Sequence, residues 1–265
     1  MVSACWIFSW PSVSSVLVRV PLQVSRLNSS RFDPMLPPDG KPLLCYVTDR
    51  RSLVYPPEQN LSEQLLQKIE VTATAGVNWI QIREKDLSGK DIAALTRATL
   101  SRVSKHSGHA QLATRVLVND RLDVALAEQA GGIHLGENSL PVAEAKRLLL
   151  DSQATQTAPH DFLVGVSCHS LEAAQSAASA GADYIFFGPI FATPSKAAYG
   201  APQGLDHLAE VCRSVNIPVL AIGGITLANI SSCIAAGAAG IAAIRLFQDA
   251  ADLPTVVRKI HQQLS

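Results

Sequence analysis

Gln81, Arg83 and Lys85 alternate along a short stretch that follows an apolar run beginning at Val77. The apolar run predicts a buried strand that becomes polar at its carboxyl end. Because side chains alternate between the two faces of a strand, these three polar side chains point to the same face. Two cations on a buried face need an anionic partner, and an Arg fork beside a Lys ammonium suits a phosphate or a pyrophosphate. We therefore predict an anion-binding site here, rather than a solvated surface strand.

Polar residues also follow most of the other predicted strands. Each has a simpler explanation on its own, since a lone histidine is commonly a structural core residue, an Asn-Asp pair can cap a helix and a Gly-Gly pair can form a tight turn. Their shared position at strand ends is the informative feature. These residues are Asn119 and Asp120; His134 and Glu137; Ser167 and His169; Thr193, Ser195 and Lys196; Gly223 and Gly224; and Arg245.

Apolar runs typical of buried strands alternate with helical segments from residue 41 to the C-terminus. The predicted strands cover residues 43–49, 77–84, 115–120, 133–136, 162–167, 184–191, 218–225 and 240–247. Repeated βα units of this kind indicate an α/β fold of the (β/α)₈ TIM-barrel type, in which parallel strands are buried on both faces. An open, doubly wound sheet is the alternative. We favour the barrel because polar residues follow nearly every strand, and in a barrel those ends meet at one mouth.

Such a mouth would offer two anion sites. The loops after the seventh and eighth strands are the usual phosphate seat of these barrels; there Gly223 and Gly224 let backbone N–H groups approach an anion, and Arg245 adds charge. The other site lies at Arg83, with Asp120 close by. A carboxylate beside an anion is explained if Mg²⁺ sits between them, because this ion takes one or two carboxylates together with substrate oxygens.

Composition bounds the class of protein. The chain has 265 residues, of which 48% are hydrophobic and 17% charged, which is enough to bury a large core. Lys plus Arg and Asp plus Glu both number 22, so no overall field attracts nucleic acid or a membrane, and small molecules are the expected partners. The scattered cysteines contain no CxxC pair and predict reduced thiols in a cytoplasmic protein. The composition is compatible with a monomer and with a homo-oligomer.

Residues 1–40 differ from the rest of the chain. They carry several Ser, Arg and Pro residues, lack a helical or strand period, and contain no apolar run long enough for a membrane helix. We expect a disordered N-terminal extension, either a targeting segment or the product of a start codon placed upstream of Met35. The predicted barrel domain is therefore 41–265.

Short polar motifs lie at or after the predicted strands. They are QIREKD at 81–86, VNDR at 118–121, GIHLGE at 132–137, GVSCHS at 165–170, FFGPIFATPSK at 186–196 and AIGGIT at 221–226. The Arg-Glu-Lys, Asn-Asp and Thr-Pro-Ser-Lys elements among them are specific in combination. From residue 44 to the C-terminus, the chain resembles thiamine phosphate synthase and its sister group, the TenI-like thiazole tautomerases.

The resemblance implies a reaction in which a pyrimidinylmethyl diphosphate and a thiazole phosphate form thiamine phosphate and pyrophosphate. It implies that the pyrimidine diphosphate is held by Gln81, Arg83, Lys85 and Asn119, with Asp120 on Mg²⁺. The thiazole phosphate end would be held by Ser167, Thr193, Ser195, Gly223 and Gly224, with His169 and Arg245 nearby. Lys196 would stabilise the departing pyrophosphate together with Arg83 and Lys85.

Two departures from the family pattern keep alternatives open. Synthases usually carry a second metal-binding Asp where this chain has Ser139, and Glu137 could substitute for it. Arg245 stands where the family usually has a small residue such as Ser. Both changes favour the tautomerase branch, in which His169 would move a proton on the thiazole. Retention of Lys85, Asp120 and Lys196 favours the synthase, and a non-catalytic ligand-binding paralogue is the third hypothesis.

Overall fold

The computed structural model describes residues 37, 40–53, 60–105, 114–154, 157–193 and 201–264. Parallel strands in this part of the chain pair in sequence order and close into a barrel, because β8 pairs with β1. The strands are β1 (Leu43–Val47), β2 (Trp79–Ile82), β3 (Arg115–Asn119), β4 (Gly132–Leu135), β5 (Leu163–Cys168), β6 (Tyr184–Phe187), β7 (Val219–Ile222) and β8 (Gly240–Ala243). The predicted (β/α)₈ barrel is confirmed.

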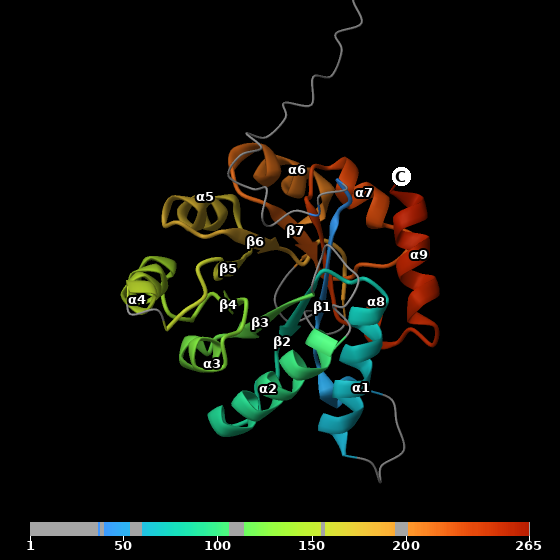
Figure 1. The fold of residues 1–265 in the computed structure, drawn as a ribbon. Helices are drawn as coiled ribbons and strands as arrows, with labels where there is room; N and C mark the ends of the chain where they lie inside the picture. The colour runs from blue at the N-terminus through green and yellow to red at the C-terminus, as the bar shows by residue number, and fades with distance from the viewer. Residues whose placement is uncertain are drawn as a thin grey trace, which may run out of the picture.

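Helices surround the strands (Figure 1). Local sequence explains where several of them begin; for example, the Asp91 N–H donates to Ser88 Oγ at 3.2 Å, and this cap starts the second helix. The helices are α1 (Leu61–Thr74), α2 (Gly89–Lys105), α3 (Leu122–Ala127), α4 (Val142–Ala154), α5 (Leu171–Ser179), α6 (Gly204–Ser214), α7 (Ile230–Ala235), α8 (Arg245–Gln248) and α9 (Leu253–Gln263), with a 3₁₀ turn η2 (Arg50–Ser52).

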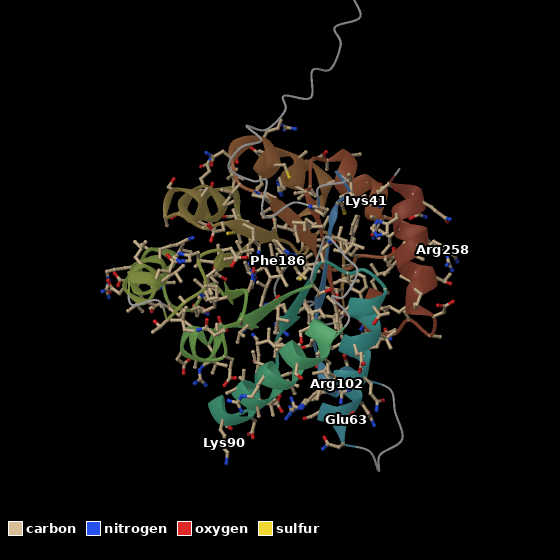
Figure 2. All side chains as sticks on the ribbon, viewed as in Figure 1. Lys41, Glu63, Lys90, Arg102, Phe186 and Arg258 are labelled. Atoms are coloured by element: carbon tan, nitrogen blue, oxygen red, sulfur yellow. The ribbon has the colours of Figure 1, made fainter. Side chains whose placement is uncertain are left out.

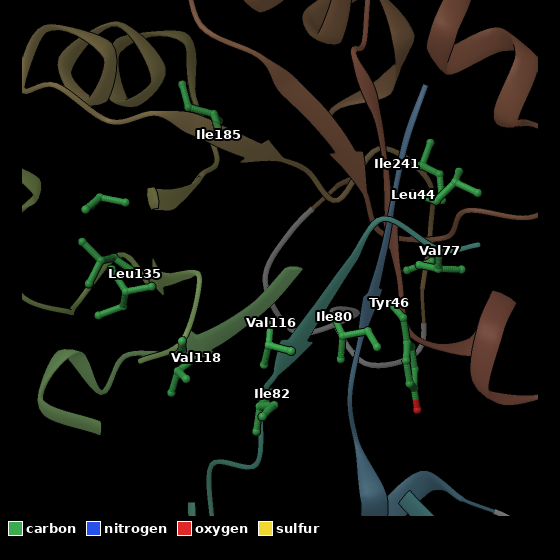
Figure 3. Close-up of a cluster of buried hydrophobic side chains, with 14 of the residues drawn as sticks. Leu44, Tyr46, Val77, Ile80, Ile82, Val116, Val118, Leu135, Ile185 and Ile241 are labelled. Atoms are coloured by element: carbon green, nitrogen blue, oxygen red, sulfur yellow. The ribbon is translucent and has the colours of Figure 1, made fainter. Parts of the chain in front are cut away.

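Side-chain alternation along the strands creates two apolar layers. Residues such as Ile80, Ile82 and Val116 face outward and pack under the helices (Figure 3). Residues such as Trp79 and Phe186 face inward and fill the barrel, and Figure 2 shows Phe186 in the middle of the molecule. The prediction that Gln81 and its neighbours Ile80 and Ile82 face opposite sides of the strand agrees with this arrangement.

The barrel interior contains an aromatic stack. Trp79 and Tyr184 have ring centroids 4.8 Å apart, and His134 and Phe186 have centroids 4.1 Å apart. Gly165 pairs with Tyr184 in the sheet, and a Cβ at Gly165 would lie 1.9 Å from Tyr184 Cζ. Because Gly165 has no side chain, the Tyr184 ring can pack directly against its backbone.

Several predicted strand ends are wrong. The strands predicted over 184–191 and 218–225 end at Phe187 and Ile222. Residues 240–247 form a strand only as far as Ala243, and Arg245 begins α8. A continuous apolar run does not distinguish a strand from a helix by its period, and here Phe247 and Gln248 are buried from a short helix instead. Most of the segment 1–40 lies outside the described residues. No helix in the described ranges is long and apolar enough to cross a membrane.

Candidate active site

The carboxyl ends of β2 and β3 carry a continuous polar chain at the mouth of the barrel. The Gln81 side-chain amide donates to Asn119 Oδ1 at 2.9 Å, and Asn119 Nδ2 donates to Asp120 Oδ2 at 2.8 Å. Gln81 is 1% exposed, and its Oε1 atom accepts no hydrogen bond within the described part of the chain. A buried acceptor without a donor is costly, so this atom is suited to an N–H or O–H group of a ligand.

Arg83 and Lys85 lie after the end of β2 and not on a buried strand face as predicted, since Arg83 is half-buried and Lys85 is exposed. The backbone between them is held by residues that follow β1. The Arg83 N–H donates to Thr48 Oγ1 at 3.0 Å, and the Thr48 hydroxyl donates to Glu84 Oε1 at 2.6 Å. Glu84 is 4% exposed and accepts from Arg50 Nη1 at 3.0 Å. The buried carboxylate thus fixes the strand end whose neighbouring side chains carry the two cations.

Arg50 also forms an ion pair with Asp86, the second acidic residue of this segment. Its guanidinium donates two 2.6 Å hydrogen bonds to Asp86, and this pairing lowers the pKa of Asp86 to about 2. Because Arg50 engages both Glu84 and Asp86, neither acid neutralises the predicted anion site. Among the described residues, Arg83 and Lys85 form no ion pair. Sequence reasoning missed Thr48 and Arg50, which lie more than 30 positions from their partners.

Asp120 is held in a conformation that few residues adopt. Its φ angle is 60°, which Asp tolerates better than most side chains, and its N–H donates to the His134 carbonyl at 3.0 Å. The Asp120 carboxylate accepts from the Gly136 N–H at 3.0 Å and from the Ser139 hydroxyl. Ser139 therefore binds Asp120 directly, as its place in the loop after β4 allows.

The donor set around Asp120 is sparse for a metal. Glu137 is exposed and forms no hydrogen bond with Asp120, and the described residues contain no group of three or more acids, histidines or cysteines that could hold an ion. One carboxylate and one hydroxyl fit Mg²⁺ only if substrate and water oxygens supply the other ligands. That fit is the kind this ion commonly has with phosphorylated substrates.

The opposite side of the mouth is built from backbone. Gly223 and Gly224 have φ angles of 94° and 68°, and their carbonyls accept from the Phe191 N–H at 3.0 Å and Asn229 Nδ2 at 2.9 Å. Their own N–H groups donate no hydrogen bond to another described residue. Amides with this arrangement can receive an anion, and the anion site at these glycines stays a prediction. Arg245 lies after β8 and is exposed.

Two histidines lie near these elements in different settings. His134 is buried, with Nδ1 3.2 Å from the Tyr184 hydroxyl and Nε2 2.9 Å from Ser167 Oγ. Burial lowers the pKa of His134 to about 3, so the ring is neutral. His169 is half-buried, and its Nδ1 donates to the Gly188 carbonyl.

The remaining predicted residues lie on the loop after β6. Thr193 is half-buried and is the last described residue before the gap at 194–200. Ser195 and Lys196 fall within that gap, so the predictions made for them lie outside the described residues. Of the free cysteines, Cys45, Cys168 and Cys233 are buried, as expected of reduced core residues.

Comparisons with known proteins agree with this geometry. A family model described as thiamine monophosphate synthase matches residues 51–247. The thiamine-phosphate synthase of Roseiflexus sp. strain RS-1 is 38% identical over 239 residues, which is 90% of this chain and 92% of its own. That of Chlorobium phaeobacteroides is 39% identical over 230 residues, 85% of this chain and 97% of its own.

Among solved structures, a thiamine phosphate pyrophosphorylase from Pyrococcus furiosus is 27% identical, with a TM-score of 0.68 over 84% of this chain and 95% of that chain. The family match spans β2 to β8 and so includes the loops that build both sides of the mouth. This chain belongs to the thiamine monophosphate synthase family.

Proposed function

We propose that this protein is a thiamine-phosphate synthase. It joins 4-amino-2-methyl-5-(diphosphooxymethyl)pyrimidine to a thiazole phosphate and releases pyrophosphate. The C–O bond of the pyrimidinylmethyl diphosphate breaks, pyrophosphate leaves with the bonding electrons, and the thiazole nitrogen forms the new C–N bond. A protein nucleophile is not needed, which agrees with a mouth built from cations, amides and hydroxyls.

The proposal is supported most directly by the way in which the charged side chains after β2 are paired. Arg50 pairs with Glu84 and Asp86, whereas the adjacent Arg83 and Lys85 have no carboxylate partner among the described residues. Arg83 is half-buried and Lys85 is exposed, and unpaired cations beside each other after a strand are suited to an anionic ligand. Aimed at a diphosphate, they stabilise the negative charge that grows on it as the C–O bond breaks.

Gln81 supports an aminopyrimidine in particular. Its Nε2 is committed to Asn119, so Oε1 is the atom that remains for a ligand, and it is an acceptor in a buried position. The amino group of the pyrimidine is a donor that would satisfy it. Asn119 links this contact to Asp120, so the ring and the diphosphate would be held by one connected set of side chains.

Asp120, with Ser139 beside it, would hold Mg²⁺, and Glu137 remains a further proposed ligand. When bound, the ion would neutralise charge on the diphosphate. Asp120 itself is oriented by the Gly136 N–H and by the Ser139 hydroxyl. These two contacts orient the carboxylate before a ligand binds.

The thiazole phosphate would bind on the other side of the mouth. The N–H groups of Gly223 and Gly224 would receive its phosphate, with Ser167 and Thr193 as hydroxyl donors and Arg245 as a nearby cation. His169 lies beside this subsite. The sequence resemblance adds two residues. Ser195 would contact the thiazole phosphate, and Lys196 would stabilise the departing pyrophosphate. The phosphorylated substrates suit the cytoplasmic location that the cysteines predict.

The test is an assay of the purified full-length protein with both substrates, with and without Mg²⁺ and a chelator. A synthase forms thiamine phosphate and pyrophosphate in equal amounts, and only when both substrates are present. Isomerisation of a thiazole carboxylate phosphate in the absence of the pyrimidine would instead identify a tautomerase using His169. Binding of both ligands without turnover in either assay would identify a non-catalytic paralogue.

A further inference from the structure

A line of three side chains runs from the barrel interior to the mouth, and the proposed reaction uses only the last of them. The Tyr184 hydroxyl lies 3.2 Å from His134 Nδ1, and His134 Nε2 lies 2.9 Å from Ser167 Oγ. Tyr184 and His134 are buried, whereas Ser167 is half-buried at the carboxyl end of β5. Within the described ranges, His134 is the hydrogen-bond partner of both hydroxyls and no other is present.

The direction of these hydrogen bonds can be worked out. A neutral imidazole has one N–H and one acceptor nitrogen. If Nδ1 carried the hydrogen, the buried phenol of Tyr184 would have no acceptor, and that loss disfavours the tautomer by on the order of ten- to a hundredfold. Tyr184 therefore donates to Nδ1, the hydrogen of the ring is on Nε2, and Nε2 donates to Ser167 Oγ.

The surroundings keep the ring neutral and in one orientation. No carboxylate is hydrogen-bonded to His134. Burial lowers the pKa of the ring most, the Asp120 charge raises it and the Arg83 charge lowers it, so burial outweighs the nearby carboxylate. Phe186 stacks on one side with centroids 4.1 Å apart and an interplanar angle of 32°. Tyr184 is itself held by Trp79 and by the space that Gly165 leaves for it.

The consequence concerns the Ser167 hydroxyl. An isolated serine hydroxyl can rotate and serve as donor or acceptor. Here one lone pair of Oγ is occupied by the His134 N–H, so the hydroxyl hydrogen is directed elsewhere. Ser167 is half-buried and has no second partner among the described residues. Its hydrogen is therefore available to an acceptor on a bound molecule.

We infer that Tyr184 and His134 are positioning residues that fix the Ser167 hydroxyl as a hydrogen-bond donor to substrate. The acceptor would be an oxygen or nitrogen lone pair of the ligand, and a phosphate oxygen of the thiazole substrate is the acceptor expected if the proposed function holds. The arrangement selects for acceptors at this point of the mouth and rejects groups that would themselves donate.

The tautomer can be measured without any substrate. In protein labelled with ¹⁵N-histidine, the resonances of His134 are assigned by their loss in His134→Gln. We expect the wild type to show one neutral ring with the hydrogen on Nε2 throughout the range pH 6 to 8, and Tyr184→Phe to show a mixture of tautomers. A hydrogen on Nδ1, or a protonated ring at pH 7, overturns the inference.

Kinetics then test the effect on substrate. Ser167→Ala identifies the substrate whose KM depends on the hydroxyl, and Tyr184→Phe should raise that same KM by about three- to tenfold. In the Ser167→Ala background, Tyr184→Phe should change it by less than about twofold, because there is no hydroxyl left to orient. Equal effects of Tyr184→Phe in both backgrounds would mean a purely structural role and would overturn the inference.

Tyr46→Phe is the matched control. It also removes a buried tyrosine hydroxyl from the same barrel, 3.0 Å from Gln248 Oε1, but on the outer layer. It should leave the KM unchanged. The two experiments separate the claims, because the predicted tautomer without thiamine phosphate formation refutes only the proposed function. Thiamine phosphate formation with equal Tyr184→Phe effects in both backgrounds refutes only the inference about Tyr184 and His134.

Discussion

The two sides of the barrel mouth prepare for an anion by different means. After β2 and β3 the groups are side chains, two of them cationic, and they are braced by a buried carboxylate and Arg50. After β7 the groups are backbone amides, placed by two glycines with positive φ. Side-chain cations on flexible stems can follow a diphosphate as it departs, whereas fixed amides suit a phosphate that stays in place. The difference matches a reaction in which one substrate loses its anion and the other keeps it.

Removing a cation from the side-chain half should lower turnover more than any change to the residues behind it or to the backbone half. Arg83→Ala is expected to lower kcat about a hundredfold, since one preorganised charge at a developing anion is worth about 3 kcal/mol. Arg97→Ala is the control, because Arg97 pairs with Glu128 on the surface at 2.5 Å and is 70% exposed. Steady-state assays of both variants decide the point, and wild-type turnover in Arg83→Ala would remove this residue from the departure of pyrophosphate.

The next largest effect is expected from Glu84, the buried carboxylate that holds Arg50 and Thr48 behind the two cations. Glu84→Gln keeps the shape of the side chain but removes the charge that binds Arg50 and orients Thr48. We expect the free energy of unfolding to fall by about 2 kcal/mol and kcat to fall several-fold, because hydrogen bonds to a buried charged group are among the strong ones. Urea unfolding and turnover measure the two effects.

Glu144→Gln is the matched control for Glu84→Gln. It removes the same charge from an ion pair with Arg147 in which both side chains are exposed, and such pairs contribute about 0–1 kcal/mol. If both variants lose the same stability and neither loses activity, then Glu84 is no more than another surface acid, and the side-chain half does not depend on its brace.

The sequence predicted this contrast only in part. Alternating apolar runs gave the barrel, and the alternation of Gln81, Arg83 and Lys85 indicated an anion site, because these signals are local. The brace was missed because Thr48 and Arg50 meet Glu84 only when β1 and β2 pair. Tyr184 was missed as well, since an aromatic residue in an apolar strand has no local sign that its hydroxyl is used.

The backbone half should respond to added volume rather than lost charge. Gly224→Ala places a Cβ 2.7 Å from Phe191 Cβ and 2.8 Å from the Ala192 carbonyl oxygen, at a φ of 68°. The backbone must shift, so we expect the KM for the thiazole phosphate to rise about tenfold with a smaller change in kcat.

Gly76→Ala separates strain from site geometry. Gly76 also has a positive φ, 92°, but nothing lies within 4 Å of an added Cβ, and it precedes β2 at the amino end of the barrel. Gly76→Ala should lose about 1 kcal/mol of stability from the positive φ alone, and Gly224→Ala should lose more, because its added Cβ also clashes with neighbouring backbone. A KM that rises equally in both would show that the loop glycines serve stability alone.

The smallest predicted effect concerns Ser139, and its sign depends on the metal. The Ser139 hydroxyl donates to the Asp120 carboxylate, so Ser139→Asp would place two carboxylates in contact. Without Mg²⁺ their repulsion should lower the melting temperature and weaken pyrophosphate binding. With Mg²⁺ the second carboxylate becomes a ligand, and the Mg²⁺ concentration for half-maximal rate should fall by roughly threefold.

Three further variants bound this last prediction. Ser139→Asn has a similar size without the charge and should show no metal-dependent change in melting temperature. Glu137→Gln should raise the Mg²⁺ requirement if Glu137 fills part of the missing coordination, and Asp120→Asn should nearly abolish turnover. If Ser139→Asp only destabilised the protein, its effect would be unfavourable both with and without Mg²⁺. An effect that is unfavourable without Mg²⁺ and favourable with it therefore identifies position 139 as part of a metal site. If wild type and Ser139→Asp titrate identically with Mg²⁺, or if a chelator leaves the wild type fully active, Asp120 does not act through a metal and the side-chain half of the mouth works with its cations alone.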